Sequence, residues 1–194
     1  MMISNNLFSL ESKTALVTGG STGLGLMATA GLAAAGAKVL IVSRKLENCE
    51  KAAKKINNCD FKGQVVPFKG DLSSEAGIDN IVDELHKKNS ELHVLVNNAG
   101  RTWGSNFGSF PYDAWEKVLN LNVSALFHLT QKLVPLLAAS AKRDSPTRVI
   151  NIGSVMGEVP MGDGAYSYAA SKSAVHHITR ILAKELAEKN ITVN

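Results

Sequence analysis

The sequence contains few cysteines, few aromatic residues and no long apolar run. Cys49 and Cys59 are its only cysteines. Their separation matches no metal-binding or redox motif, so we expect both thiols to stay reduced in the cytoplasm. No apolar stretch approaches the roughly 20 residues that cross a bilayer. The first residues, MMISNNLFSLESK, also lack the basic and apolar segments of a secretion signal. We therefore expect a cytoplasmic protein that does not enter a membrane.

The charge of the chain is low as well. Its net charge is +4 over 194 residues, and no basic patch carries the aromatic residues typical of nucleic-acid binding. Hydrophobic residues make up 45% of the sequence, and the length allows one well-buried domain rather than two. We expect a single domain over residues 1–194 in which residues 1–12 form an N-terminal tail.

Short β-branched runs alternate with longer helical patterns along the chain. Strands are predicted at residues 14–19, 38–43, 64–70, 92–100, 147–154 and 191–194, and helices at 26–36, 46–56, 75–89, 112–141 and 166–189. Continuously apolar strands imply a sheet covered on both faces, and strict alternation with helices implies parallel strands. The fold class is therefore α/β, a doubly wound parallel sheet of the Rossmann type. The chain ends as the sixth strand begins, which predicts a fragment.

A glycine-rich turn, TGGSTGLG over residues 18–25, joins the first strand to the first helix. Turns without side chains let the backbone approach a pyrophosphate, and a helix N-terminus carries partial positive charge. A tight turn needed only for packing is the alternative, because glycine is a common turn residue. The residues expected to contact a dinucleotide are Gly19, Ser21, Thr22, Gly23, Leu24 and Gly25.

The end of the second strand indicates which dinucleotide binds. An NAD site usually places a carboxylate there to bind the ribose hydroxyls. This chain has Ser43, Arg44 and Lys45 instead. A guanidinium matches the geometry of a phosphate, so we expect Arg44, with Ser43 and Lys45, to bind the 2′-phosphate of NADP(H). The alternative is a solvated surface arginine.

The segment AYSYAASKSAV holds two tyrosines and a lysine. Residues four apart share a helix face, so Tyr168 and Lys172 form a pair, whereas Tyr166 faces elsewhere. A nearby ammonium favours the phenolate form of a tyrosine and so adapts it for proton transfer. A helix that simply buries a tyrosine and solvates a lysine is the alternative.

Five motifs in order resemble those of the short-chain dehydrogenase/reductase family. They are Thr18-Gly-x-x-x-Gly-x-Gly25, Asn97-Asn-Ala-Gly100, Asn122, Ser154 and Tyr168-x-x-x-Lys172. The resemblance runs from about Lys13 to Asn194. Within the family, the segments NNAGRTWG, INIGSVMG and GAYSYAASK are most similar to 3-oxoacyl reductases, especially the rhamnolipid-biosynthesis type. The resemblance implies an NADP(H)-dependent enzyme that interconverts a small-molecule carbonyl, such as a 3-oxoacyl group, and a secondary alcohol.

The family also implies roles for matching residues. Tyr168 would exchange a proton with the substrate oxygen, and Lys172 would assist it and hold the nicotinamide ribose. Ser154 would hydrogen-bond the substrate oxygen, and Asn122 would position a water. The residues implied on the adenosine side of the cofactor are Asp71, Leu72, Asn98, Ala99 and Gly100. Alternatives remain, because Ser154 can cap a turn, Asn122 can bond locally and Asp71 can form the turn before the third helix.

The resemblance further implies a homodimer or homotetramer assembled through the long helices. Family members continue beyond ITVN into a segment that covers the substrate, so a dinucleotide-binding or subunit-interaction module without turnover is the alternative function. We expect His176 and His177 to lie on a packing face between helices rather than to bind a metal. Trp103 is expected either to line the substrate cleft or to pack.

Overall fold

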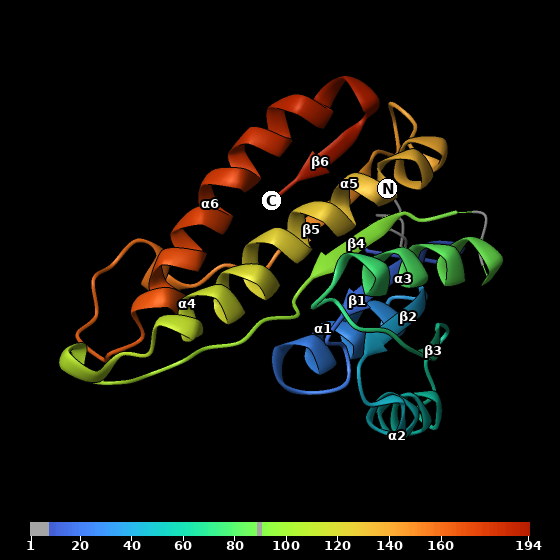
Figure 1. Cartoon of the computed structure of the whole chain (residues 1–194). Helices are drawn as coiled ribbons and strands as arrows, with labels where there is room; N and C mark the ends of the chain where they lie inside the picture. Colours follow the sequence, from blue (N-terminus) through green and yellow to red (C-terminus); the bar gives the residue numbers. More distant parts are fainter. Residues whose placement is uncertain (1–7, 89–90) are drawn as a thin grey trace.

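The computed structural model describes residues 8–88 and 91–194, and within them strands and helices alternate along the chain (Figure 1). The strands are β1 (Thr14–Thr18), β2 (Lys38–Ser43), β3 (Gln64–Lys69), β4 (Val94–Asn97), β5 (Thr147–Asn151) and β6 (Ile191–Val193). The α-helices are α1 (Gly23–Ala34), α2 (Leu46–Asn57), α3 (Glu75–Lys88), α4 (Tyr112–Leu119), α5 (Ala125–Ser140) and α6 (Tyr166–Leu186).

The strands form one sheet in the order β3-β2-β1-β4-β5-β6, and every pair is parallel. The chain builds outward from β1 in one direction and from β4 in the other, so the strand order reverses between these two central strands. Ligands of doubly wound sheets bind at such a reversal, beyond the carboxyl ends of the strands. The predicted Rossmann-type fold is confirmed, and the fold places its site at the ends of β1 and β4.

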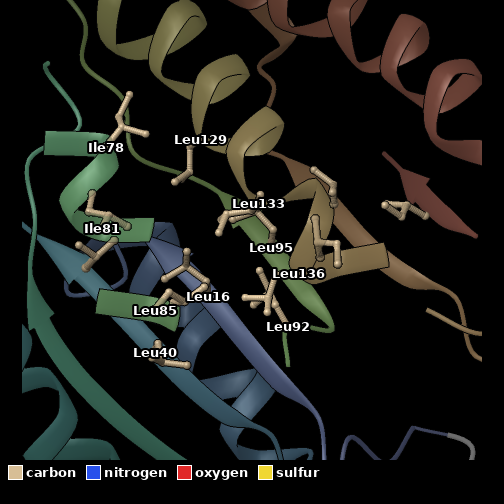
Figure 2. Close-up of a cluster of buried hydrophobic side chains, with 14 of the residues drawn as sticks. Leu16, Leu40, Ile78, Ile81, Leu85, Leu92, Leu95, Leu129, Leu133 and Leu136 are labelled. Carbon is tan, nitrogen blue, oxygen red and sulfur yellow. The ribbon is translucent and has the colours of Figure 1, made fainter. Parts of the chain in front are cut away.

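Both faces of the sheet are covered, which explains the continuously apolar strands. On one face, Leu16, Leu40 and Leu95 pack with leucine and isoleucine side chains of α3 and α5 (Figure 2). On the other face, the alternate strand residues Val17 and Ile41 pack with alanines and Cys49 of α1 and α2. Successive strand residues point to opposite faces, so each strand contributes to both cores.

The long helical region predicted over residues 112–141 is present, but it is not a single α-helix. It consists of α4, a π-helical turn (Asn120–Ser124) and α5. A π turn carries one more residue per turn than an α-helix, and such turns are frequent at functional sites. Asn122 lies in this turn and is 2% exposed. The π-helical turn therefore sets the direction in which the buried side chain of Asn122 points.

Several boundaries differ from the predicted ones. The strand predicted over residues 147–154 ends at Asn151, and Ser154 begins a short 3-10 turn (Val155–Gly157) instead. Asn89, in the predicted third helix, and residues 1–7 of the predicted tail lie outside the described residues. The main-chain N–H of Leu10 donates to the carbonyl of Ala35 over 2.7 Å, so part of the predicted tail packs on the domain. In the described part of the chain, no helix is long and apolar enough to cross a membrane.

Candidate functional site

The glycine-rich turn between β1 and α1 closes tightly at the start of the helix. Gly19 and Gly23 have positive φ angles of 64° and 53°, a region that side-chain-bearing residues rarely adopt. A Cβ on Gly25 would lie 2.3 Å from the carbonyl oxygen of Gly19. Gly20 was missed by sequence reasoning, although a Cβ there would lie 2.7 Å from Ile41 Cγ2. The two adjacent glycines, Gly19 and Gly20, were the feature of the sequence that could have identified it.

Thr18 and Asn98 tie the ends of the two central strands together. The Oγ1 of Thr18 accepts hydrogen bonds from the main-chain N–H groups of Asn98 and Ala99, each over 3.0 Å. The side-chain amide of Asn98 donates to the carbonyl of Thr18 over 2.9 Å. The side chain of the neighbouring Asn97 is buried and donates to Thr130 and Asn151, so Asn97 serves packing. The glycine turn and the loop after β4 thus form one rigid unit.

A first cavity of about 330 Å³ lies beside this unit, at the ends of β2 and β3. Of the residues predicted to bind the cofactor, it is lined by Gly19, Thr22, Ser43, Arg44, Asp71, Leu72, Asn98, Ala99 and Gly100. Ser21, Gly23, Gly25 and Lys45 are not among the lining residues, whereas Lys117 and Asn120 of the α4 region are, without having been predicted. Helical periodicity does not reveal which end of a helix approaches the sheet, so Lys117 and Asn120 could not have been identified from the sequence.

Asp71 has a structural role in this cavity wall. Its Oδ1 accepts the main-chain N–H of Ser73 over 2.9 Å. That hydrogen bond is the main reason why the pKa of Asp71 is lowered, and the charge of Arg44 contributes less. The turn-forming alternative is therefore observed, on a residue that also lines the cavity.

A second cavity, of about 550 Å³, contains Tyr168 and Lys172 in its lining. Asn98, Gly100 and Arg101 line both cavities. Leu24 of the glycine turn and Gly153 and Met156 of the loop after β5 also line the second one. The two cavities therefore form one site across the ends of the central strands, with the tyrosine and lysine at one end and Arg44 at the other.

Lys172 is 7% exposed, and its Nζ donates to the carbonyl of Ile152. The same Nζ lies 5.6 Å from the centroid of the Tyr168 ring. Burial lowers the pKa of Lys172 because an apolar environment disfavours the ammonium. Tyr166 does face elsewhere, since its ring contacts Phe107 and Phe110 edge to face at 5.8 and 5.4 Å.

Asn122 connects the loop after β4 to the helix that carries Tyr168. Its Oδ1 accepts the main-chain N–H of Arg101 over 2.8 Å, and its Nδ2 donates to the carbonyl of Arg101 and to Ser171 Oγ, each over 2.9 Å. Ser171 Oγ in turn donates to the carbonyl of Tyr168 over 2.7 Å. The side chain of Asn122 thus links the loop after β4 to α6, and the local bonding proposed as the alternative is not what the structure shows. Ser171, fully buried, is a further residue that the sequence did not single out.

Ser154 follows β5 and borders the second cavity without lining it. Its Oγ accepts the main-chain N–H of Met156 over 3.3 Å, as the turn-capping alternative predicts. Its own N–H donates to Nε2 of His176 over 3.3 Å.

The predicted helix–helix face for the two histidines is wrong, because His176 contacts the loop that carries Ser154 and His177 is exposed. Trp103 is 43% exposed, and its neighbours Arg101 and Thr102, rather than Trp103 itself, line the second cavity.

The fold and these motifs have counterparts among known proteins. The rhamnolipids biosynthesis 3-oxoacyl-(acyl-carrier-protein) reductase of Pseudomonas aeruginosa is 47% identical over 187 residues, covering 96% of this chain and 72% of that protein. The 5-keto-D-gluconate 5-reductase of Escherichia coli is 34% identical over 190 residues, covering 98% and 72%. A solved Pseudomonas aeruginosa RhlG/NADP active-site complex matches with a TM-score of 0.91 at 46% identity, covering 96% of this chain and 72% of that one.

The match to the family itself covers nearly the whole chain. Residues 13–194, which hold all six strands of the sheet and each motif of the site, match the short chain dehydrogenase family. The chain therefore belongs to the short-chain dehydrogenase family.

Proposed function

We propose that this chain is an NADP(H)-dependent oxidoreductase that interconverts a carbonyl and a secondary alcohol. The observation that carries the proposal is the joined site: Tyr168 and Lys172 line a cavity that continues, through Asn98 and Gly100, into the cavity of Arg44. A dinucleotide needs such a site, with a phosphate-binding turn near its middle and reactive groups at one end. The nicotinamide supplies the hydride when bound, and the protein supplies orientation and a proton.

The cofactor end fits a phosphorylated dinucleotide. Gly19 and Thr22 of the glycine-rich turn line the first cavity, and the turn is so tight that a Cβ on Gly25 would lie 2.3 Å from the carbonyl oxygen of Gly19. Arg44 and Ser43 line the same cavity, and their types suit a 2′-phosphate. The similar Pseudomonas aeruginosa structure is an NADP complex. We assign the phosphate contacts to the turn and to Arg44, and the adenosine contacts to Asp71, Leu72 and Asn98–Gly100.

The reactive end fits proton transfer to or from a substrate oxygen. Tyr168 gives its phenolic proton to the carbonyl oxygen during reduction and takes it back during oxidation. Lys172, buried and bonded to Ile152, places its Nζ 5.6 Å from the centroid of the Tyr168 ring and holds the ribose of the cofactor. Ser154 donates a hydrogen bond to the same substrate oxygen. Asn122 holds the turn of α6 through Ser171 and orients the water that connects Lys172 to solvent.

A ketone with an apolar chain, such as a 3-oxoacyl thioester, is the substrate that we favour. A third cavity, of about 600 Å³, adjoins the second at Ala165, which lines both. Its lining is mostly aromatic and apolar: Phe107, Phe110, Tyr112, Trp115, Pro160, Met161, Ala165, Tyr166 and Ala169. Burial of an alkyl chain there contributes roughly 0.8 kcal/mol per methylene. Turnover of long 3-oxoacyl thioesters should therefore exceed turnover of acetoacetyl thioesters and of 5-keto-D-gluconate, and the reverse order would contradict this assignment.

We further propose a homodimer formed through α5 and α6. Phe127 on α5 is 36% exposed and Ile181 on α6 is 51% exposed. An apolar surface on more than one side of a helix favours a protein partner. Sedimentation velocity should show a dimer that Ile181→Asp weakens, and a stable monomeric wild type would contradict the proposal.

The alternative function is a dinucleotide-binding module without turnover. The chain covers 72% of the length of the relatives above. Two measurements separate the functions: the thermal shift on adding NADPH, and NADPH consumption with 3-oxoacyl thioesters. We expect both binding and turnover, with Tyr168→Phe lowering kcat at least about 100-fold while NADPH still binds. Binding without wild-type turnover would favour the module.

A further inference from the structure

Three side chains of α6 hold the loop that carries Ser154. Lys172 Nζ donates to the carbonyl of Ile152, and Ser173 Oγ donates to the carbonyl of Gly157 over 2.6 Å. Between these two anchors, Nε2 of His176 accepts the main-chain N–H of Ser154 over 3.3 Å. His176 lies four residues after Lys172 and eight after Tyr168, so all three occupy one helix face. The residues of the proposed proton transfer and the anchor of Ser154 are thus on the same rigid element.

The loop packs on the His176 ring too closely for other side chains. A Cβ on Gly153 would lie 2.4 Å from Nε2, and a Cβ on Gly157 would lie 2.8 Å from Cε1 of the same ring. Neither glycine has the positive φ angle that would by itself explain its choice. The imidazole therefore fills the space between the two glycines and fixes the path of the chain on both sides of Ser154.

The hydrogen bond to Ser154 also fixes the tautomer of a neutral His176. Since Nε2 accepts a hydrogen bond from the Ser154 N–H, the proton of the neutral ring must be on Nδ1. Nδ1 is buried and lies 3.4 Å from Oε1 of Glu158, close enough for electrostatic attraction but without hydrogen-bond geometry. Glu158 follows the same loop, so its carboxylate favours the tautomer that leaves Nε2 free to accept.

We propose that His176 is the positioning residue for Ser154: its Nε2 holds the Ser154 main chain, and thereby sets where the serine hydroxyl stands relative to Tyr168. The proposal rests on the function proposed above. Ser154 needs such an anchor because, within the residues that the structure describes, the only hydrogen bond of its Oγ is the one from the main-chain N–H of Met156, in its own turn. A displacement of about 1 Å at a reacting group can lower a rate by about 100-fold.

The test compares His176→Leu with His176→Gln. Leucine fills much of the space but accepts no hydrogen bond, whereas a glutamine oxygen can accept near the position of Nε2. His176→Leu should lower kcat roughly tenfold to a hundredfold while the KM for NADPH changes less than about twofold, and His176→Gln should retain most of the wild-type kcat. His177→Leu, at the exposed neighbouring residue, is the matched control and should leave kcat unchanged.

Hydrogen exchange of residues 152–158 gives a readout that needs no substrate. His176→Leu should speed exchange in this segment but not in β1, and His176→Gln should restore slow exchange. Equal losses of kcat in both variants, or faster exchange with an unchanged kcat, would overturn the proposal. If the wild type shows no turnover, the proposed function fails. The exchange comparison then decides separately whether His176 holds the loop, and unchanged exchange in His176→Leu overturns that as well.

Discussion

The carbonyl oxygen of Gly19 lies 2.3 Å from the point that a Cβ would occupy on Gly25. Real Cβ contacts are not that short, so the turn and the first turn of α1 must separate if residue 25 carries a side chain. Both residues belong to the proposed phosphate cradle. Space, rather than backbone flexibility, is thus the reason for a glycine at position 25, because no positive φ is present there.

Gly25→Ala should destabilise the domain by about 1–3 kcal/mol, because overpacking forces the backbone to move. It should also abolish NADPH binding. Gly31→Ala is the matched control: Gly31 lies in the same helix, and nothing stands within 4 Å of its added Cβ. That change should stabilise the protein by about 0.5–1 kcal/mol. Urea unfolding and NADPH fluorescence titration check both results, and similar effects of the two changes would contradict the steric explanation.

Arg44→Asp should invert the preference between dinucleotides. A charged hydrogen bond contributes about 1.5–3 kcal/mol, and each 1.4 kcal/mol is a factor of ten, so the ratio of kcat/KM for NADPH over NADH should fall about 100-fold. Lys45→Asp changes the charge equally at the next residue, whose side chain does not line the cavity. The ratio should change far less in this control. An unchanged preference in Arg44→Asp would refute the 2′-phosphate assignment.

Much of the fold could be predicted because local signals agree with it. The strands of the sheet are apolar on both faces, and glycines mark the turn after β1, so alternation and topology followed from the sequence. Tyr168, Lys172 and Arg44 could be chosen as candidates because their chemistry stands out at defined spacings. The structure brings Tyr168 and Lys172 to one cavity and Arg44 to the cavity that joins it.

The parts that could not be predicted depend on contacts between distant segments. The π turn around Asn122 has no periodic signal, because its side chain bonds to Arg101 and Ser171, which are 21 and 49 residues away in the sequence. The role of His176 depends on a loop 22 residues before it. The end of β2 was predicted correctly, whereas the other strands were predicted to run one to three residues too far. After β5, for example, Ile152 is still apolar and still bonds to Asn97 of β4, so the sequence pattern does not mark the end of the strand.

Asn122→Ala should cost about 2–4 kcal/mol of unfolding free energy. The change removes three hydrogen bonds made by a side chain that is 2% exposed, and each bond contributes about 0.5–1.5 kcal/mol. Asn120→Ala, in the same π turn, is the control. Asn120 is exposed and donates one bond to the carbonyl of Ser73, so its loss should cost about 0.5–1.5 kcal/mol. Urea unfolding measures both, and equal costs would show that the buried bonds of Asn122 do not stabilise the turn.

Lys172→Met should change the pH dependence of stability in a defined direction. Burial lowers the folded pKa of Lys172 below the ordinary lysine value of 10.5. Between these two pKa values the unfolded chain binds more protons than the folded one, so this group makes stability rise with pH across that window. The cost of burying the ammonium is present below the lowered pKa and is lost above 10.5.

Urea unfolding from neutral pH upward should therefore show the stability of the wild type increasing relative to Lys172→Met. Lys184→Met, at an exposed position of the same helix, should keep a constant difference from the wild type. A wild-type stability that falls relative to Lys172→Met as pH rises would mean that the folded protein favours the charged ammonium, and Lys172 would then not be a desolvated lysine.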